Sequence, residues 1–300
     1  MKNSALTLEK ANLEKNRVAL ISVLAAILLT ATKLVVGLAT GSLGILSEAA
    51  HSGLDLVAAI ITLFAVRWSG KPADEQHTYG HGKIENLSAM IETGLLLLTC
   101  GWIIYEAIQR LFFKSVHVEA SVWAFGIMIL SIVVDYNRSR ALYGVARKYN
   151  SQALEADALH FSTDIWSSAV VILGLVLVRL ADTFNIPSLA QADAVAALVV
   201  AGIVVFVSLQ LGRRTIAGLL DEIPVGLRDE VVDIVKQVPG VRKVKHVRLR
   251  WSGAEAFVDV VITARKDVSF KRSHEIATHA EKAIQEYLPE AEVTVHIEPT

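Results

Sequence analysis

The stretch SLGILSEAAHSGLDLVAAIITLFAVRW, residues 42–68, decides the fold, because it is long enough to cross a bilayer yet carries His51 and Asp55 near its middle. An uncompensated Asp at mid-membrane costs about 2.5–3.5 kcal/mol even on the mildest insertion scale. Residues 154–178 form a second apolar segment, in which His160 and Asp164 have the same spacing. On an α-helix this spacing puts both side chains on nearly one face, so each helix presents an imidazole and a carboxylate together.

Composition indicates an integral membrane protein. The chain has 300 residues, 53% of them hydrophobic, and a mean hydropathy of +0.47, which is too apolar for an ordinary soluble domain. The formal net charge is −1, so no overall basic field favours nucleic acid as a partner. The only cysteine, Cys100, lies in an apolar run, which excludes an intrachain disulfide framework and a thiolate metal cage. The polar start and uninterrupted apolar run after it predict no removable signal peptide.

Six apolar segments predict six transmembrane helices. They cover residues 18–38, 43–66, 87–113, 122–136, 154–180 and 192–211. The segments on one side of the predicted bundle are rich in Lys and Arg, whereas the loops on the other side hold only Arg110, Lys114 and Arg179. The positive-inside rule therefore predicts that both termini lie in the cytoplasm.

After residue 220 the pattern changes to that of a small α+β domain. Pro224 begins an amphipathic helix, two strands with apolar periodicity follow, Ser269 is a candidate N-cap for a second helix, and an alternating strand ends the chain. The order αββαβ predicts a ferredoxin-like cytoplasmic domain. We therefore divide the chain into a cytoplasmic N-terminal segment, 1–17, a membrane all-α six-helix bundle, 18–213, and a cytoplasmic regulatory and dimerisation domain, 214–300.

The two His-x-x-x-Asp helices predict a metal site if they pack together. His51, Asp55, His160 and Asp164 would offer two nitrogens and two oxygens, a set suited to tetrahedral Zn²⁺. Two carboxylates and two neutral imidazoles around a divalent cation sum to zero charge, which makes burial tolerable. The histidines can take protons when the metal leaves, so metal and protons compete for one site, which is the physical basis of antiport. Interhelical hydrogen bonds that only hold the bundle together are the alternative.

A second constellation lies in the loop KPADEQHTYGHGK, residues 71–83, where Asp74, His77 and His81 offer three ligands within eight residues. Such a set on an exposed backbone suits a labile metal site that water completes. The alternative is an ordinary solvated loop. Three acids at or near membrane depth are further candidates to line a water-filled route: Glu48, Glu92 and Asp157.

The tail holds a third, weaker set of candidate ligands. His296 and Glu298 share one face of the last strand, and His246 and His274 lie on elements that the topology can bring near them. Ligands spread over separate elements are weak evidence, so polar surface positions remain the alternative.

The six helices, the paired His-x-x-x-Asp motifs, the Asp-x-x-His-x-x-x-His loop and the αββαβ tail together resemble the cation diffusion facilitator family of divalent-metal/proton antiporters. The resemblance covers the chain from about residue 16. It implies that the paired motifs form the transport site, that the loop forms a second metal site, and that the tail dimerises and binds regulatory metal. The tail ligands that it implies are His274, His296 and Glu298.

The same resemblance matches Lys83 and Asp221 to a charge interlock between membrane and tail regions, and Leu159 to a hydrophobic gate. With His51 on the second helix, the pattern resembles the zinc-handling members. It implies a homodimeric Zn²⁺/H⁺ antiporter that exports metal by alternating access. The implied location is a bacterial cytoplasmic (inner) membrane. Zn²⁺ is then both substrate and regulatory ligand, with no organic cofactor, and the partners are divalent metals, protons, lipid and a second copy of the chain.

Three alternatives stay open at this point. The substrate of such an exporter can instead be Fe²⁺, Mn²⁺, Co²⁺ or Cd²⁺, since affinity order alone does not select among them. An intramembrane metalloenzyme is disfavoured, because the sequence has no HExxH motif and no activated nucleophile. A non-transporting metal sensor or membrane assembly scaffold built on the tail is the third possibility. The sequence therefore favours a secondary transporter over an enzyme.

Overall fold

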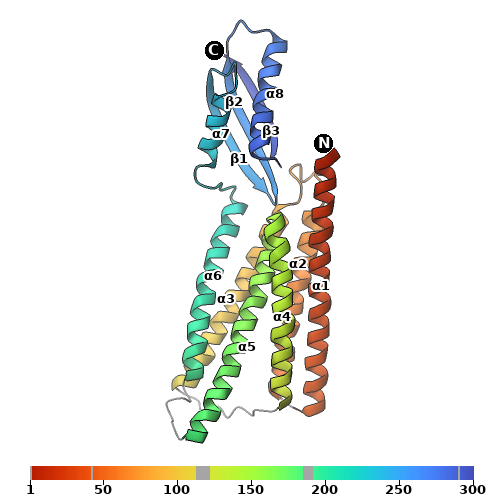
Figure 1. Cartoon of the computed structure of the whole chain (residues 1–300), viewed down its shortest axis with the longest axis vertical. Helices are drawn as coiled ribbons and strands as arrows, with labels where there is room; N and C mark the ends of the chain where they lie inside the picture. Colours follow the sequence, from red (N-terminus) through yellow and green to blue (C-terminus); the bar gives the residue numbers. More distant parts are fainter. Residues whose placement is uncertain (1, 42, 113–121, 185–191, 290) are drawn as a thin grey trace.

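The chain folds into a long helical bundle with a small α/β domain at one end (Figure 1). The computed structural model describes residues 2–41, 43–112, 122–184, 192–289 and 291–300. The N-terminus lies at the end of the bundle that carries the small domain (Figure 1). Both ends of the described chain are therefore on the same side of the molecule.

The helices of the bundle run past the apolar segments that predicted them. Their bounds are α1 Lys2–Thr40, α2 Leu43–Ser69, α3 Lys83–Phe112, α4 Val122–Tyr149, α5 Gln152–Phe184 and α6 Ala192–Leu219. The polar residues before position 18, predicted as a separate segment, continue α1 as helix, and α4 extends well beyond residue 136. The reason is that backbone hydrogen bonds hold a helix together whether its side chains face lipid or water. Hydropathy locates the apolar run and not the helix end.

Among the described residues, four helices are long and apolar enough to cross a membrane: α1, α2, α3 and α6. The helices α4 and α5 are not among them, so the predicted count of six spans is not confirmed by this criterion. Both carry ionisable side chains that are buried inside the bundle, including Asp135, Arg138 and Asp164. Charged side chains that point into the bundle lower the mean hydropathy of a helix, while the surface that the helix presents to lipid stays apolar.

The outside of the bundle is apolar and its inside is partly polar. Leu28, Leu98 and Phe206 point outward with 69%, 73% and 70% of their surface exposed. Polar side chains such as Thr62 and Glu92 are fully buried. This inversion of the soluble pattern is what a bundle embedded in lipid requires, since exposed large apolar groups are costly only in water. The described helices therefore belong to an integral membrane protein.

Helix packing brings the two His-x-x-x-Asp helices together. The helix α1 packs on α2 and α4, α3 packs on α2, α5 and α6, and α2 contacts α5 directly. The largest fully buried side chain, Phe161 on α5, belongs to the core formed by α1, α2, α4 and α5. The Arg138 guanidinium of α4 lies 3.5 Å from the centre of the Phe161 ring. This cation–π contact helps to fix α5, and hence the neighbouring His160, against α4.

The small domain has the predicted αββαβ order. Its elements are α7 Leu227–Lys236, β1 Lys243–Ser252, β2 Glu255–Ala264, α8 Phe270–Tyr287 and β3 Ala291–Pro299. The strand order is β1-β2-β3, with β1 antiparallel and β3 parallel to β2. The predicted N-cap of α8 is confirmed, because Ser269 Oγ accepts a hydrogen bond of 3.3 Å from the backbone N–H of Arg272.

The helices cover one face of this sheet. Val258, Val260 and Ile262 of β2 are buried in one core with Val235 of α7 and Ile284 of α8. Because successive strand residues point to opposite faces, the intervening positions of β2 face away from the helices. The strand register places His246, Val261 and His296 in one row across this second face.

The loop between α2 and α3 rests on the small domain. Tyr79 makes an edge-to-face contact with the Phe257 ring, with ring centres 5.1 Å apart. The Arg250 guanidinium stacks 3.3 Å from the centre of the Tyr79 ring. The backbone of Gly82 approaches the β1–β2 turn at Ser252 so closely that no side chain fits between them. The loop therefore connects the bundle to the sheet.

This approach makes Gly82→Ala a test of the junction. An added Cβ would lie 2.3 Å from the Ser252 carbonyl oxygen. Because this oxygen belongs to the backbone and cannot rotate away as a side chain can, the overlap costs about 1–3 kcal/mol. We expect the loop and the β1–β2 turn to separate, with faster amide hydrogen exchange at residues 252–255 and an intact bundle. Gly94→Ala is the matched control, because nothing lies within 4 Å of its added Cβ. Equal exchange in the two variants would contradict the contact.

Candidate functional site

The four predicted residues of α2 and α5 meet inside the bundle. His160 Nε2 lies 3.1 Å from Asp55 Oδ1 and 3.7 Å from Asp164 Oδ2. His51 Nε2 lies 3.7 Å from Asp164 Oδ1 and 3.9 Å from Asp55 Oδ1. Each imidazole therefore contacts a carboxylate of its own helix and one of the other helix. We call these four residues the central cluster.

The geometry of the central cluster fits a small divalent cation. Two ligands bound at about 2.0–2.1 Å to a tetrahedral ion lie about 3.3 Å apart, and the four imidazole–carboxylate distances range from 3.1 to 3.9 Å. Asp55, His160 and Asp164 are buried, with 8%, 4% and 8% of their surface exposed. The His51 side chain is 37% exposed. The cluster thus has three enclosed ligands and one accessible edge, an arrangement that allows an ion to enter and leave.

A buried lysine stands beside the central cluster, and the sequence prediction did not single it out. Lys33 Nζ on α1 donates to Ser52 Oγ at 2.8 Å and lies 3.2 Å from Glu48 Oε2. Its positive charge also acts on Asp164. A lysine inside an apolar run is itself a signal of a functional or paired residue. Lys33 therefore contributes positive potential next to the two carboxylates.

Leu159, the predicted gate, lies one residue before His160 and packs against apolar side chains of α3, α5 and α6. It contacts the buried group made by Ala89 of α3, Ala156 of α5 and Leu211 of α6. This position is on the side of the central cluster that faces the small domain, because α5 begins at that end. The packing is consistent with a hydrophobic constriction, and its role as a gate stays a prediction.

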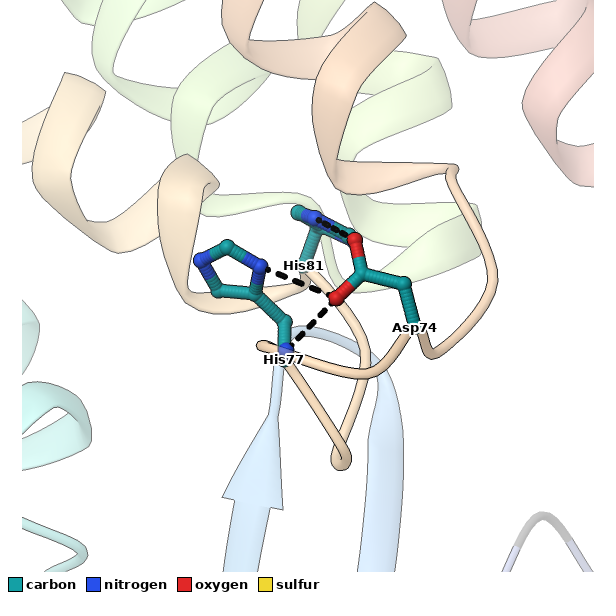
Figure 2. A group of neighbouring side chains, drawn as sticks. All are labelled: Asp74, His77 and His81. Atoms are coloured by element: carbon teal, nitrogen blue, oxygen red, sulfur yellow. Dashed lines mark hydrogen bonds and ion pairs between the residues drawn. The ribbon is translucent and has the colours of Figure 1, made fainter.

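The loop residues also meet, as predicted, and their contacts converge on one carboxylate. Figure 2 shows the imidazoles of His77 and His81 directed at Asp74. Asp74 Oδ1 lies 3.2 Å from His77 Nδ1, and Oδ2 lies 3.3 Å from His81 Nε2. The two imidazole ring centres are 4.4 Å apart. We call these three residues the loop cluster.

Backbone hydrogen bonds fix the carboxylate of the loop cluster. Asp74 Oδ1 accepts from the backbone N–H of His77 at 2.6 Å and of Gln76 at 2.9 Å. The His77 amide is the main reason that the pKa of Asp74 lies below its ordinary value of 3.8. Asp74 and His77 are exposed, so water can complete the coordination of a bound ion. A site of this kind holds metal loosely and exchanges it readily.

The tail residues do not form one ligand set within this chain. His246 Nε2 accepts a hydrogen bond of 2.6 Å from Arg248 Nε. His296 Nε2 lies 4.0 Å from Glu298 Oε1, and Glu298 is also paired with Lys245, which lowers the pKa of its carboxyl. Among the described residues, two groups of three candidate ligands lie close enough to hold one ion. They are the loop cluster, and His51, Asp55 and Asp164 of the central cluster, a group that does not include His160.

His274 lies on α8, whereas the row of His246 and His296 lies on the sheet face that the helices leave open. One chain therefore separates His274 from His246 and His296, although His274 and Glu298 line one pocket. A second chain would be needed to bring them into one metal site.

The predicted charge interlock is present as an ion pair. Lys83 Nζ at the start of α3 lies 2.9 Å from Asp221 Oδ1 and donates to the Leu219 carbonyl oxygen at 3.3 Å. Both side chains are partly exposed, with 37% and 40% of their surface accessible, so the pair by itself adds little stability. It ties the start of α3 to the end of α6, at the point where the chain passes into the small domain.

Comparison with known proteins gives matches along nearly the whole chain. Residues 19–220 match the family described as "Cation efflux transmembrane domain", and residues 224–300 match the family described as "Cation efflux protein, cytoplasmic domain". The chain is 32% identical to the "Cation-efflux pump FieF" of Cronobacter sakazakii, covering 95% of this chain and 92% of that protein. It is 29% identical to that of Serratia proteamaculans, covering 96% and 94%.

A solved structure, "MamM-CTD 215-293", matches with 27% identity over 24% of this chain and 92% of that chain, at a TM-score of 0.23. That score is too low for a structural argument. The sequence matches alone show the family, and they cover both the bundle and the small domain.

The loop cluster predicts a defined pH dependence. Metal bound there should be released as the solution is acidified, because protons compete with metal for the imidazole nitrogens. The backbone N–H of His77 holds the pKa of Asp74 below its ordinary value, so this carboxylate stays ionised at mildly acidic pH. Co²⁺ absorption of the full-length protein would measure binding, with the loop signal defined as the part lost in His77→Ala. Asp74→Asn should weaken binding about tenfold at every pH, and a changed pH slope in this variant would contradict the assignment.

Proposed function

Because the chain belongs to the cation diffusion facilitator family, we propose that it exports a divalent metal cation, Zn²⁺, from the cytoplasm in exchange for protons. The observation that carries the proposal is the meeting of two imidazoles and two carboxylates from α2 and α5 inside an apolar bundle. Two nitrogens and two oxygens form a ligand set suited to tetrahedral zinc. The family and the fold together make the chain a transporter and not an enzyme.

Exchange follows from the chemistry of the central cluster. A bound divalent cation balances the two carboxylates, so the loaded site is neutral inside the membrane. When the metal leaves, the carboxylates remain, and protons on the imidazoles restore the balance. Metal binding and proton binding therefore exclude each other at one site. Alternating access requires that this site open first to one side and then to the other.

We propose six membrane spans with both termini in the cytoplasm. The hydropathy criterion supports α1, α2, α3 and α6, while α4 and α5 bury Asp135, Arg138 and Asp164 inside the bundle. An even number of spans agrees with the position of both ends of the described chain at one end of the bundle (Figure 1). In this proposal residues 18–213 form the membrane domain, and 1–17 and 214–300 are cytoplasmic. The bacterial relatives support a cytoplasmic (inner) membrane.

We propose that the small domain dimerises and binds regulatory metal. The match to a cytoplasmic domain of cation efflux proteins supports its location. His246 and His296 lie in one row on the helix-free face of the sheet, and a partner's ligands would complete the coordination that one chain lacks. The ion pair between Lys83 and Asp221 would then transmit a change in the dimer to the start of α3.

The proposal that Zn²⁺ is the transported ion depends only on the ligands of the central cluster. Softer imidazole nitrogens favour Zn²⁺ over Mn²⁺, but Fe²⁺, Co²⁺ and Cd²⁺ also accept mixed nitrogen and oxygen ligands. An exporter of these ions is the second candidate within the family. The central cluster includes His51 where a third carboxylate would favour harder ions, and this position is the reason that we place Zn²⁺ first.

The decisive test is Asp164→Asn. The amide keeps the volume of the carboxylate but removes one of two negative charges that balance the cation, so the loaded site would carry a buried positive charge. We expect a folded, monodisperse protein whose Zn²⁺ flux in proteoliposomes falls at least about a hundredfold. The release of protons on metal addition should fall as well. Near-parental flux would remove α5 from the transport site.

Asp74→Asn is the matched control for this test, because the loop cluster is exposed and water can replace its carboxylate. Its flux should fall by less than that of Asp164→Asn. Metal binding without flux in the parent protein would instead favour a sensor or scaffold.

Metal choice is tested by His51→Asp. A third carboxylate makes the cluster harder and more negative, so we expect the ratio of Mn²⁺ to Zn²⁺ transport to rise by about tenfold or more. Uptake of Zn²⁺, Fe²⁺, Mn²⁺ and Cd²⁺ would be compared in the same liposomes at two pH gradients. Unchanged relative rates would show that His51 does not select the metal.

A further inference from the structure

Two further carboxylates are buried in the bundle outside the central cluster. Glu92 of α3 and Asp157 of α5 each have 0% of their surface exposed. Their helices are in contact, and Ala89, one turn before Glu92, packs against Ala156, the neighbour of Asp157. The charge of Asp157 acts on the Glu92 carboxyl. The two acids therefore occupy one region of the interior.

Each carboxylate has one oxygen bonded and one oxygen without a partner. Thr62 of α2 donates a hydrogen bond to Glu92 Oε1, and Ser22 of α1 donates to Asp157 Oδ2 at 3.5 Å. Glu92 Oε2 and Asp157 Oδ1 make no hydrogen bond of normal geometry among the described residues, although the Ser88 hydroxyl, one turn before Glu92, lies close enough to act on its carboxyl. A buried carboxylate oxygen without a partner is costly, and native proteins rarely leave one unsatisfied. These two oxygens are free to bind something that the protein itself does not supply.

No side-chain cation is bonded directly to either carboxylate in the described part of the chain. The guanidinium of Arg138 is nearby, but its NH1 lies 3.1 Å from Asp135 Oδ1 and its NH2 donates to Ser22 Oγ at 3.1 Å. Arg138 therefore shares the Ser22 hydroxyl with Asp157 without bonding to its carboxylate, although its charge and that of His160 act on Asp157. Glu92, Asp157 and Asp135 together carry more negative charge, when all are ionised, than Arg138 balances. A divalent cation would remove that excess.

Glu92 and Asp157 lie between the central cluster and the small domain. Asp157 precedes His160 by three residues, or about 4.5 Å along α5, toward the end at which the small domain sits. Thr62, the partner of Glu92, follows Asp55 by seven residues, or about 10 Å along α2, in the same direction. Leu159 and its apolar neighbours lie at this level of the bundle as well. An ion that moves from the small-domain end to the central cluster passes this pair.

We propose that Glu92 and Asp157 form a second divalent-cation site in the bundle, a relay site that passes metal to the central cluster. The inference rests on the proposed transport function. Its ligands are the two unpartnered carboxylate oxygens, with the hydroxyls of Thr62 and Ser22 beside them. An oxygen-only set holds Zn²⁺ less tightly than a set with two imidazoles. Metal therefore moves from the relay site to the central cluster, because the central cluster binds it more tightly.

The test locates bound Cd²⁺ in crystals of the full-length protein by anomalous scattering at saturating Cd²⁺. We expect one peak in the central cluster and a second peak between Glu92 and Asp157. Glu92→Gln keeps the hydrogen bond from Thr62 and should lose the second peak alone, and Asp157→Asn should do the same. Glu155→Gln, two residues from Asp157 on the same helix and paired with Arg214, should keep both peaks.

Transport provides a second readout with the same variants. Loss of the relay site should raise the Zn²⁺ concentration for half-maximal flux at least about tenfold, with maximal flux changed much less, because the central cluster is intact. An unchanged concentration dependence in Glu92→Gln would overturn the proposal.

The two proposals fail in distinguishable ways. A central peak without a second peak in the parent protein, as expected if the pair holds only protons, overturns the relay site and leaves the transport site standing. A second peak without a central peak would instead contradict the proposed transport site.

Discussion

The contact between His160 of α5 and Asp55 of α2, 3.1 Å across the helix interface, is the interaction on which the rest of the structure depends. A carboxylate at membrane depth is stable only if a partner compensates its charge. The same need brings α2 and α5 together and places His51, Asp55 and Asp164 within reach of one ion, with His160 bonded to Asp55 beside them. Stability of the bundle and affinity for a cation therefore come from the same residues, so a bound metal also acts as a cross-link between the two helices.

Most other ionisable groups inside the bundle are paired as well. Lys33 is bonded to Ser52, Arg138 is paired with Asp135, and Lys15 Nζ of α1 lies 2.8 Å from Glu85 Oε1 of α3. The bonds of Lys33 and Lys15 connect different helices, and Arg138, paired with Asp135 within α4, also bonds Ser22 of α1, so these contacts limit the ways in which the helices can move. Among the described residues, the buried side-chain atoms without a hydrogen-bond partner include oxygens of Glu92 and Asp157 and the Nδ1 atom of His160. Unpartnered atoms of this kind are expected where the missing partner is the transported ion.

The loop between α2 and α3 is the main physical connection between the bundle and the sheet. It carries the loop cluster, and its Tyr79 contacts both the Arg250 guanidinium and the edge of the Phe257 ring. A metal ion that draws Asp74, His77 and His81 together would stiffen the segment that ends at Gly82, where the backbone touches the β1–β2 turn. Metal binding to the loop cluster, if it occurs, would therefore be coupled to the position of the small domain through a few close contacts.

Sequence alone predicted the parts of this protein that depend on local pattern. Spacing put His51 and Asp55 on one helix face, periodicity gave the αββαβ order, and Ser269 identified a helix start. Spacing within a short loop also brought Asp74 close to its two histidines, because so few residues separate them.

Only the tertiary structure decided which faces of different helices meet, because packing between distant segments depends on shape and not on local periodicity. It paired His160 with Asp55, put Lys33 beside the cluster and left Glu92 and Asp157 with free oxygens. It also separated His274 from His296 by placing them on opposite sides of one sheet. The strand periodicity alone could not predict this separation, since it does not determine which face α8 covers.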